Sequence, residues 1–100
     1  MRGDILSTDK HRLEKDVEEK WCDVAKEHGW IAYKFSSPGN SSVPDRQFLR
    51  NGFVFFIEFK RPGKEATKNQ KAEHERLRKE GFIVWVIDYF DKEFAHWIFT

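Results

Sequence analysis

An apolar run that follows an Asn-Gly pair constrains the fold of this chain more than any other feature. Asn51-Gly52 is the preferred dipeptide for a two-residue type I′ turn, and strand-like residues flank it on both sides. The run Phe53-Val54-Phe55-Phe56-Ile57 therefore predicts the second strand of a β-hairpin within residues 43–63. Two charged residues, Glu58 and Lys60, interrupt the apolar pattern at its end.

The two-residue turn also fixes which residues face each other across the hairpin. If Arg50 lies opposite Phe53, the same ladder continued places Asp45 opposite Glu58. Directly opposed residues have Cβ atoms about 4.5–5.5 Å apart. Lys60 projects from the same face as Glu58 because side chains alternate along a strand. The sequence thus predicts two carboxylates and an ammonium group side by side at the open end of the hairpin.

Two interpretations of this charged end are open. In the first, the hairpin end is solvated and Lys60 neutralises Glu58 at the surface. In the second, a cation separates two carboxylates that would otherwise repel each other. Hard divalent ions such as Mg²⁺ use one or two carboxylates together with water and substrate phosphates. A neighbouring lysine can stabilise the charge that develops on a phosphate.

The rest of the chain alternates helical and strand patterns. Beside the hairpin, helices are expected at 10–28, 67–80 and over the tail KEFAHWIF, and strands at 30–36 and 82–88. Candidates for the N-cap of the first helix are Ser7, Thr8 and Asp9. The order α-β-β-β-α-β-α predicts an α/β fold in which helices flank a small mixed sheet. A chain of 100 residues is expected to form a single domain, 1–100.

The charge of the chain is nearly balanced, with 18 basic and 17 acidic side chains and a formal net charge of +1. This balance excludes the uniformly basic surface of a protein that coats nucleic acid. Any contact with nucleic acid must therefore come from local clusters. Residues 60–71 form such a cluster, with five basic side chains against Glu65.

Cellular location is constrained by what the chain lacks. Cys22 is its single cysteine, so no intrachain disulfide can form and a reducing compartment is expected. The N-terminus is polar rather than signal-like. Apolar runs stay short of membrane-spanning length. These features predict a cytoplasmic protein.

The charged hairpin end also matches a known motif. Pro44-Asp45 followed by Glu58-Phe59-Lys60 fits P-D…(D/E)-x-K. The longer pattern of SPGNSSVPDR, FIEFKRPG, Gln70 and LRKEG resembles the virus-type replication-repair nuclease (VRR-NUC) domains of the restriction-endonuclease-like superfamily. The resemblance covers about residues 13–88. It implies an αβββαβ core and a metal-dependent DNase that acts on branched DNA.

The resemblance implies a role for each residue of the motif. Asp45 and Glu58 match the metal-binding carboxylates of the family. The main-chain carbonyl of Phe59 would be a further ligand, and the metal would be Mg²⁺ or Mn²⁺. Lys60 matches the catalytic lysine.

Gln70 has two competing interpretations. It matches a glutamine of the family's active site on the helix that follows the motif. The segment Thr67-Lys68-Asn69-Gln70 is also a capping box, in which the glutamine side chain bonds back to the N-cap amide.

The first helix is expected to supply another catalytic acid. Glu18 precedes Gly29 and Lys34 at a spacing similar to the glutamate, glycine and base of the related archaeal resolvases. A helical wheel, however, places Glu14 nearer the apolar face. We therefore assign the role to Glu18, with Glu14 as the alternative.

Contacts with DNA are expected from residues around the motif, namely Lys34, Ser37, Arg61, Lys64 and Lys68. Lys34 is nearly as well explained as an exposed strand lysine. The four histidines show no metal-ligand spacing. His74, one helical turn after Gln70, is expected at the surface or at the rim of the substrate site.

The function that the resemblance implies is a structure-selective DNA endonuclease, similar to Holliday-junction resolvases and acting in the host cytoplasm if the chain is viral. The alternatives are a non-catalytic DNA-binding module on the same fold, a sequence-specific restriction enzyme and a flap- or nick-type nuclease. We also expect a homodimer, because 16% of the residues are aromatic and the segment 94–99 is apolar and free to pack on a neighbour.

Overall fold

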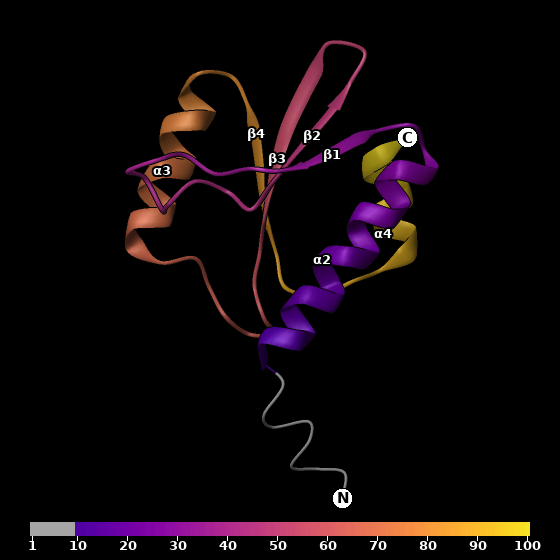
Figure 1. Cartoon of the computed structure of the whole chain (residues 1–100), viewed down its shortest axis with the longest axis horizontal. Helices are drawn as coiled ribbons and strands as arrows, with labels where there is room; N and C mark the ends of the chain where they lie inside the picture. Colours follow the sequence, from indigo (N-terminus) through magenta and orange to yellow (C-terminus); the bar gives the residue numbers. More distant parts are fainter. Residues whose placement is uncertain (1–9) are drawn as a thin grey trace, which may run out of the picture.

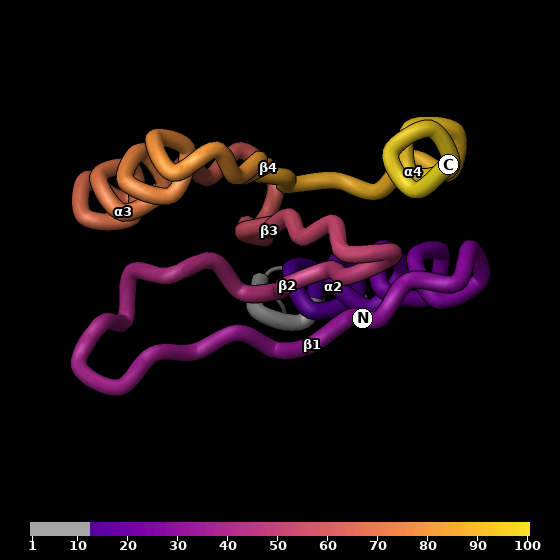
Figure 2. The backbone as a smooth tube through the Cα atoms, turned by 90° about the horizontal axis from the view of Figure 1, so that it is seen from above, coloured from indigo at the N-terminus to yellow at the C-terminus, as the bar shows by residue number. Residues whose placement is uncertain are grey.

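The computed structural model describes residues 10–100, so the N-cap candidates Ser7, Thr8 and Asp9 lie outside the described residues. The elements follow in the order α2 (Lys10–Glu27), β1 (Ile31–Lys34), β2 (Arg46–Arg50), β3 (Phe53–Phe59), α3 (Lys68–Lys79), β4 (Ile83–Ile87) and α4 (Lys92–Phe99). The α/β fold with a helix-flanked mixed sheet is confirmed. α3 covers one face of the sheet, whereas α2 and α4 lie on the other (Figures 1 and 2).

The sheet has the strand order β1-β2-β3-β4. β1 and β2 pair antiparallel, as do β2 and β3, whereas β4 runs parallel to β3. A parallel pair needs a crossover connection, which α3 provides. This crossover returns the chain from the charged end of β3 and places α3 beside that end (Figure 1).

The hairpin has the predicted register. Arg50 pairs with Phe53, and the ladder runs to Arg46 opposite Ile57. Asn51 and Gly52 have φ angles of 52° and 81°. A type I′ turn requires positive φ at both central positions, which Asn and Gly tolerate best.

The main hydrophobic core lies between the sheet and the helices α2 and α4. Trp21 is fully buried there, and its ring makes edge-to-face contacts with Phe94 and Phe99. The indole N–H of Trp21 donates to the carbonyl of Tyr89 over 2.9 Å, which satisfies the one polar atom of that side chain. Burial raises the pKa of the neighbouring Cys22 thiol to about 11, so it remains protonated.

The expectation that the C-terminal segment is free to pack on a neighbour is wrong for most of that segment. Ala95 is fully buried and Phe99 is 3% exposed, because α4 covers the same face of the sheet as α2. Only Trp97 is exposed among the large apolar side chains of α4, at 66%. No helix among residues 10–100 is long and apolar enough to cross a membrane.

Candidate active site

The charged end of the hairpin is buried rather than solvated. Glu58 is 3% exposed and Lys60 9%. The ammonium of Lys60 lies 3.3 Å from Glu58 Oε2, so the two residues form a buried ion pair. The interpretation of this pair as a surface neutralisation is therefore wrong, because both side chains are buried.

Asp45 lies at the position the hairpin register predicts, immediately beyond the last pair of the ladder. Its Oδ2 accepts the backbone N–H of Phe59 over 2.8 Å, and its own carbonyl accepts the N–H of Phe35 over 2.9 Å. Backbone groups of β3 and of the segment after β1 thus fix Asp45 at the strand ends.

Asp45 is close enough to Glu58 to affect the ionisation of the Glu58 carboxyl. Burial, followed by the negative charge of Asp45, raises the pKa of Glu58 to about 7, although the Lys60 ammonium opposes this. Burial also raises the pKa of Asp45, and the Phe59 N–H partly counteracts it. One carboxylate oxygen, Glu58 Oε1, is buried and has no hydrogen-bond partner within residues 10–100. When both carboxylates are ionised, the cluster therefore carries a net negative charge, because Lys60 balances only one of them.

Gln70 combines the two roles that the sequence presented as competitors. Its Oε1 accepts the N–H of Thr67, and its backbone N–H donates to the Thr67 hydroxyl, which completes the capping box. Its Nε2 donates to Glu58 Oε2 over 3.1 Å. An amide has both an acceptor and donors, so one side chain caps α3 and holds Glu58.

Both candidate acids of α2 lie near the carboxylate pair. Glu18 Oε2 accepts from Nε of Arg46 at 2.5 Å, and both side chains are mostly buried. The charges of Glu18 and Glu14 both help to raise the pKa of Asp45, but only that of Glu14 contributes at Glu58. Arg46 was not selected from the sequence, although its place directly after Asp45 in the motif was a usable signal.

The residues predicted to bind DNA lie on several different segments of the fold. Lys34 ends β1 and lines a recess of about 270 Å³ with Glu14, Glu18 and Arg46. Ser37 is half-buried, and its backbone forms an isolated antiparallel β-bridge with that of Asn40. Arg61 and Lys64 lie in the loop after β3, and Lys68 is the first residue of α3.

A further contact with α3 was not predicted from the sequence. Asn40 Nδ2 donates to the buried carboxylate of Glu73 over 3.2 Å, which anchors the loop between β1 and β2 on the helix. The helical spacing of Glu73 placed it near Gln70, but nothing in the sequence paired it with a loop residue.

The expectation that His74 lies at the surface or the rim is wrong. This side chain is 1% exposed, because it projects from α3 toward the sheet. Burial, then the positive charges of Arg78 and Lys60, lower the pKa of His74, so its imidazole is neutral. Its Nε2 is buried and has no hydrogen-bond partner.

The donor set suits a hard divalent cation. The unsatisfied Glu58 Oε1 and the neighbouring Asp45 carboxylate offer oxygen ligands with excess negative charge. Within residues 10–100, no group of three His, Cys, Asp or Glu side chains converges as a ready-made metal cage. Mg²⁺ is commonly held by one or two carboxylates, with water and substrate completing its shell. The residues present therefore fit this type of ion.

Comparisons with known proteins agree with this fold. The chain is 43% identical over 76 residues to "Putative nuclease p44" of Acyrthosiphon pisum secondary endosymbiont phage 1, which covers 75% of this chain and 82% of that protein. It also resembles a solved structure described as a VRR_NUC domain, with a TM-score of 0.76 and 28% identity over 86% of this chain and 92% of that one. No protein-family model matches the sequence.

Together, the mixed sheet, the crossover helix and the clustered Asp45, Glu58 and Lys60 define a restriction-endonuclease-like domain. The chain belongs to the VRR-NUC family.

Proposed function

We propose that this protein is a metal-dependent endonuclease that hydrolyses phosphodiester bonds in branched DNA. The observation that carries the proposal is the buried, unpartnered Oε1 of Glu58 beside Asp45, next to an ammonium that faces the same carboxylate. A protein that only bound DNA would gain nothing from burying two repelling carboxylates. The naming of a phage relative as a nuclease supports the same conclusion.

Each residue of the cluster has a definable part in the proposed reaction. Asp45, Glu58 and the carbonyl of Phe59 would hold Mg²⁺ or Mn²⁺. The ion would supply positive charge for activating water and for stabilising the reacting phosphate. Gln70 and the Phe59 N–H keep the two carboxylates in place. Lys60 provides a fixed positive charge close to where negative charge develops on the phosphate.

The helix acid is assigned to Glu18, with Glu14 as the alternative. Glu18 is engaged by Arg46 and orients that side chain at the start of β2. Glu14 is the α2 residue whose charge reaches both Asp45 and Glu58. Replacing each by glutamine and comparing cleavage rates separates them, since the larger loss identifies the acid that acts with the cluster.

The preferred substrate and the assembly belong to the same proposal. Lys34, Ser37, Arg61, Lys64 and Lys68 would contact phosphates around the site, which gives recognition by DNA shape rather than by base sequence. A homodimer would place two such sites for paired cuts in a four-way junction. A phage nuclease of this kind would act in the cytoplasm of the infected host.

Metal binding can be tested without cleavage. Wild-type protein should bind Mn²⁺ in a calorimetric titration, and Asp45→Asn should bind it at least about tenfold more weakly, because a charged ligand is lost. The asparagine oxygen can still accept the Phe59 N–H, so the fold should persist. Equal affinities for the two proteins would remove Asp45 from the metal site.

Catalysis is tested by removing the lysine. Lys60→Ala should reduce cleavage of a four-way junction by roughly 10²-fold or more, because a preorganised charge at the reacting phosphate is lost. Junction affinity should change little, since other basic residues contact the phosphates. Lys92→Ala, which removes a lysine from the exposed start of α4, is the matched control. Near wild-type cleavage by Lys60→Ala would contradict the assignment. Cleavage of a linear duplex of matched sequence by the wild-type protein, compared with cleavage of the junction, measures the selectivity for DNA structure.

A further inference from the structure

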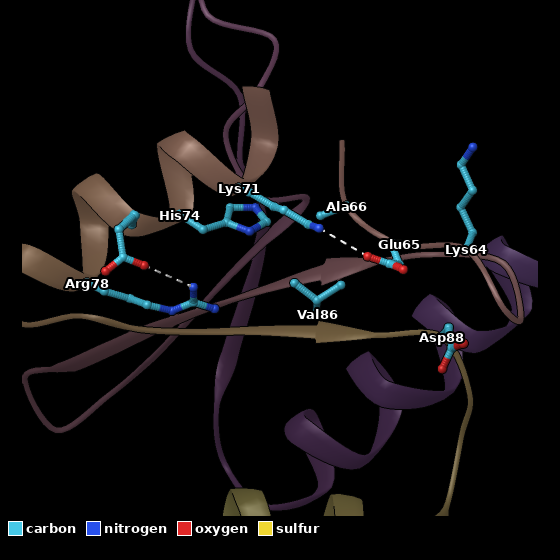
Figure 3. A pocket seen from close by; sticks show the side chains of 9 residues that line it. Lys64, Glu65, Ala66, Lys71, His74, Arg78, Val86 and Asp88 are labelled. Atoms are coloured by element: carbon cyan, nitrogen blue, oxygen red, sulfur yellow. Dashed lines mark hydrogen bonds and ion pairs between the residues drawn. The ribbon is translucent and has the colours of Figure 1, made fainter. Parts of the chain in front are cut away.

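A groove of about 540 Å³ lies between α3, β4 and the loop that follows β3. Ligand sites in proteins commonly have volumes of about 300–1,000 Å³, a range that accommodates a mononucleotide. Figure 3 shows the groove with Val86 on one side, Lys71 and His74 projecting from α3, and Lys64 and Asp88 toward the other end. None of these residues belongs to the carboxylate cluster.

The charges along the groove compensate one another. Lys71 lies 3.0 Å from Glu65, and Arg78 lies 3.7 Å from Glu75. Asp88 Oδ2 accepts the backbone N–H of Gly63 over 2.8 Å. This balance is poorly suited to a bare phosphate, which would need a surplus of positive charge. It suits a planar group that has apolar faces and a mixed donor and acceptor edge.

The walls of the groove combine apolar and polar contacts. Val86 is 40% exposed and Ala66 provides a second small apolar surface. His74, which projects from α3 beside Lys71 in Figure 3, is 99% buried, and its Nε2 has no partner among residues 10–100. Lys71 is held by an ion pair whose side chains are 60% and 83% exposed, and exposed pairs of this type are weak. A ligand can therefore displace Lys71 and give the imidazole a hydrogen bond.

The groove lies beside the carboxylate cluster, because Val86 in its wall pairs with Glu58 across β3 and β4. Lys64 follows Lys60 by four residues along the same loop, and His74 follows Gln70 by one helical turn. Gln70 itself donates to Glu58. A DNA strand whose phosphate lies at Lys60 can thus direct its next nucleotide toward Lys64 and the groove.

We propose that this groove binds the base of an unpaired nucleotide next to the phosphate that is cut. The inference rests on the proposed function and adds a recognition element to it. The unpaired base packs on Val86 and displaces Lys71 to reach His74, while Lys64 contacts the nucleotide's phosphate. Fully paired DNA cannot place a base there without unstacking it, so the groove favours branch points and gaps.

The test measures DNA binding by the full chain carrying Lys60→Ala, which should not cleave. Two labelled duplexes are compared by fluorescence anisotropy. One has a single unpaired nucleotide beside a nick, and the other has an abasic residue there, which keeps the phosphate but lacks the base. The first should bind roughly fivefold or more tightly, in the range expected for contacts to a single base. Equal affinities would overturn the proposal.

A groove-filling variant locates the effect. Val86→Phe should bring the affinity ratio of the two duplexes close to one, because the larger ring occupies the space of the base. Val54→Phe makes the same change near the hairpin turn, remote from the groove, and should preserve the ratio. Since each ratio is measured within one protein, a loss of folded material affects both duplexes equally. A ratio that survives Val86→Phe would count against the groove.

The proposed nuclease function is tested separately by wild-type cleavage of branched DNA, with four-way junction, flap and nicked substrates. Cleavage combined with a ratio near one would overturn only the groove. A ratio well above one without any cleavage would support the groove and overturn the nuclease proposal.

Discussion

The two oxygens of the Glu58 carboxylate have different environments. Oε2 faces the Lys60 ammonium and the Gln70 amide, whereas Oε1 is buried with no partner. A buried acceptor without a partner costs about 1–3 kcal/mol, and more when it carries charge. The unpartnered oxygen of Glu58 therefore makes the metal-free protein less stable, and in the proposed function the same oxygen would bind the cation.

This environment makes the stability of the metal-free protein depend on pH. The pKa of Glu58 rises from its ordinary 4.5 to about 7 in the folded state, so the folded protein binds more protons than the unfolded chain between these values. The free energy of unfolding should therefore be greatest, as far as Glu58 is concerned, below about pH 4.5. It should fall by ~3 kcal/mol as the pH rises through 7. Urea unfolding in EDTA at several pH values measures this.

Glu58→Gln is the matched control for the pH dependence, because it removes the ionisation and keeps the shape of the side chain. Between about pH 4.5 and 7, the ordinary and the raised pKa of Glu58, wild type should lose stability relative to this variant. Mn²⁺ should reduce the loss. If the two proteins keep a constant difference across that interval, the buried carboxylate is not the source.

At the scale of elements, the N-terminus of α3 links helix capping to the active site. Thr67 accepts the backbone N–H of Gln70, and the Gln70 side chain both returns to Thr67 and reaches Glu58. The position of the cap therefore decides where the amide meets the carboxylate. The parallel β3–β4 pair requires a crossover connection, and this connection places the N-terminus of α3 near the charged end of β3.

Removal of the cap should affect stability and activity together. Thr67→Ala deletes the hydroxyl acceptor and should lower the free energy of unfolding by ~1 kcal/mol, as is usual for an N-cap. It should also reduce cleavage, because the Gln70 amide loses its fixed orientation. Thr67→Ser retains the hydroxyl and should behave like wild type in both the urea titration and the cleavage assay. A Thr67→Ala protein of unchanged stability would show that the capping box contributes little.

At the scale of the whole molecule, an apolar depression at one end of the sheet remains uncovered. Phe53, Ile83 and Trp97 are exposed by 50%, 46% and 66% around a recess of about 280 Å³. Large exposed apolar patches commonly mark interfaces. This patch, rather than α4 as a whole, is where we expect a second copy of the chain to bind.

The dimer can be tested by sedimentation equilibrium without DNA. Wild-type protein at micromolar concentration should have twice the chain mass of 12.0 kDa. Trp97→Glu should shift it toward the monomer, because a buried unpaired charge destabilises an interface. Glu93→Gln, an equally exposed change on α4, should leave the dimer intact. A wild-type mass of 12.0 kDa would contradict the homodimer and favour flaps or nicks over four-way junctions as substrates.

The sequence by itself determined the hairpin and the position of its charges. Asn51-Gly52 favours a tight type I′ turn, and a two-residue turn fixes the register, so Asp45 and Glu58 both follow the last ladder pair, Arg46 with Ile57. The order of helices and strands was predicted from local features as well. These were the glycines after the first two helices and the spacing of apolar residues in each element. Such features depend on neighbouring residues, which a sequence displays directly.

The tertiary structure alone decided burial and long-range partners. Nothing local shows that α3 would cover Lys60 and bury His74, or that one amide would serve both Thr67 and Glu58. The packing partner of α4 could not be predicted either, since an apolar helix packs equally well on its own sheet or on a second copy of the chain. These outcomes depend on which surfaces the crossover of α3 and the return of α4 bring together, and that is a property of the packed chain rather than of any one segment.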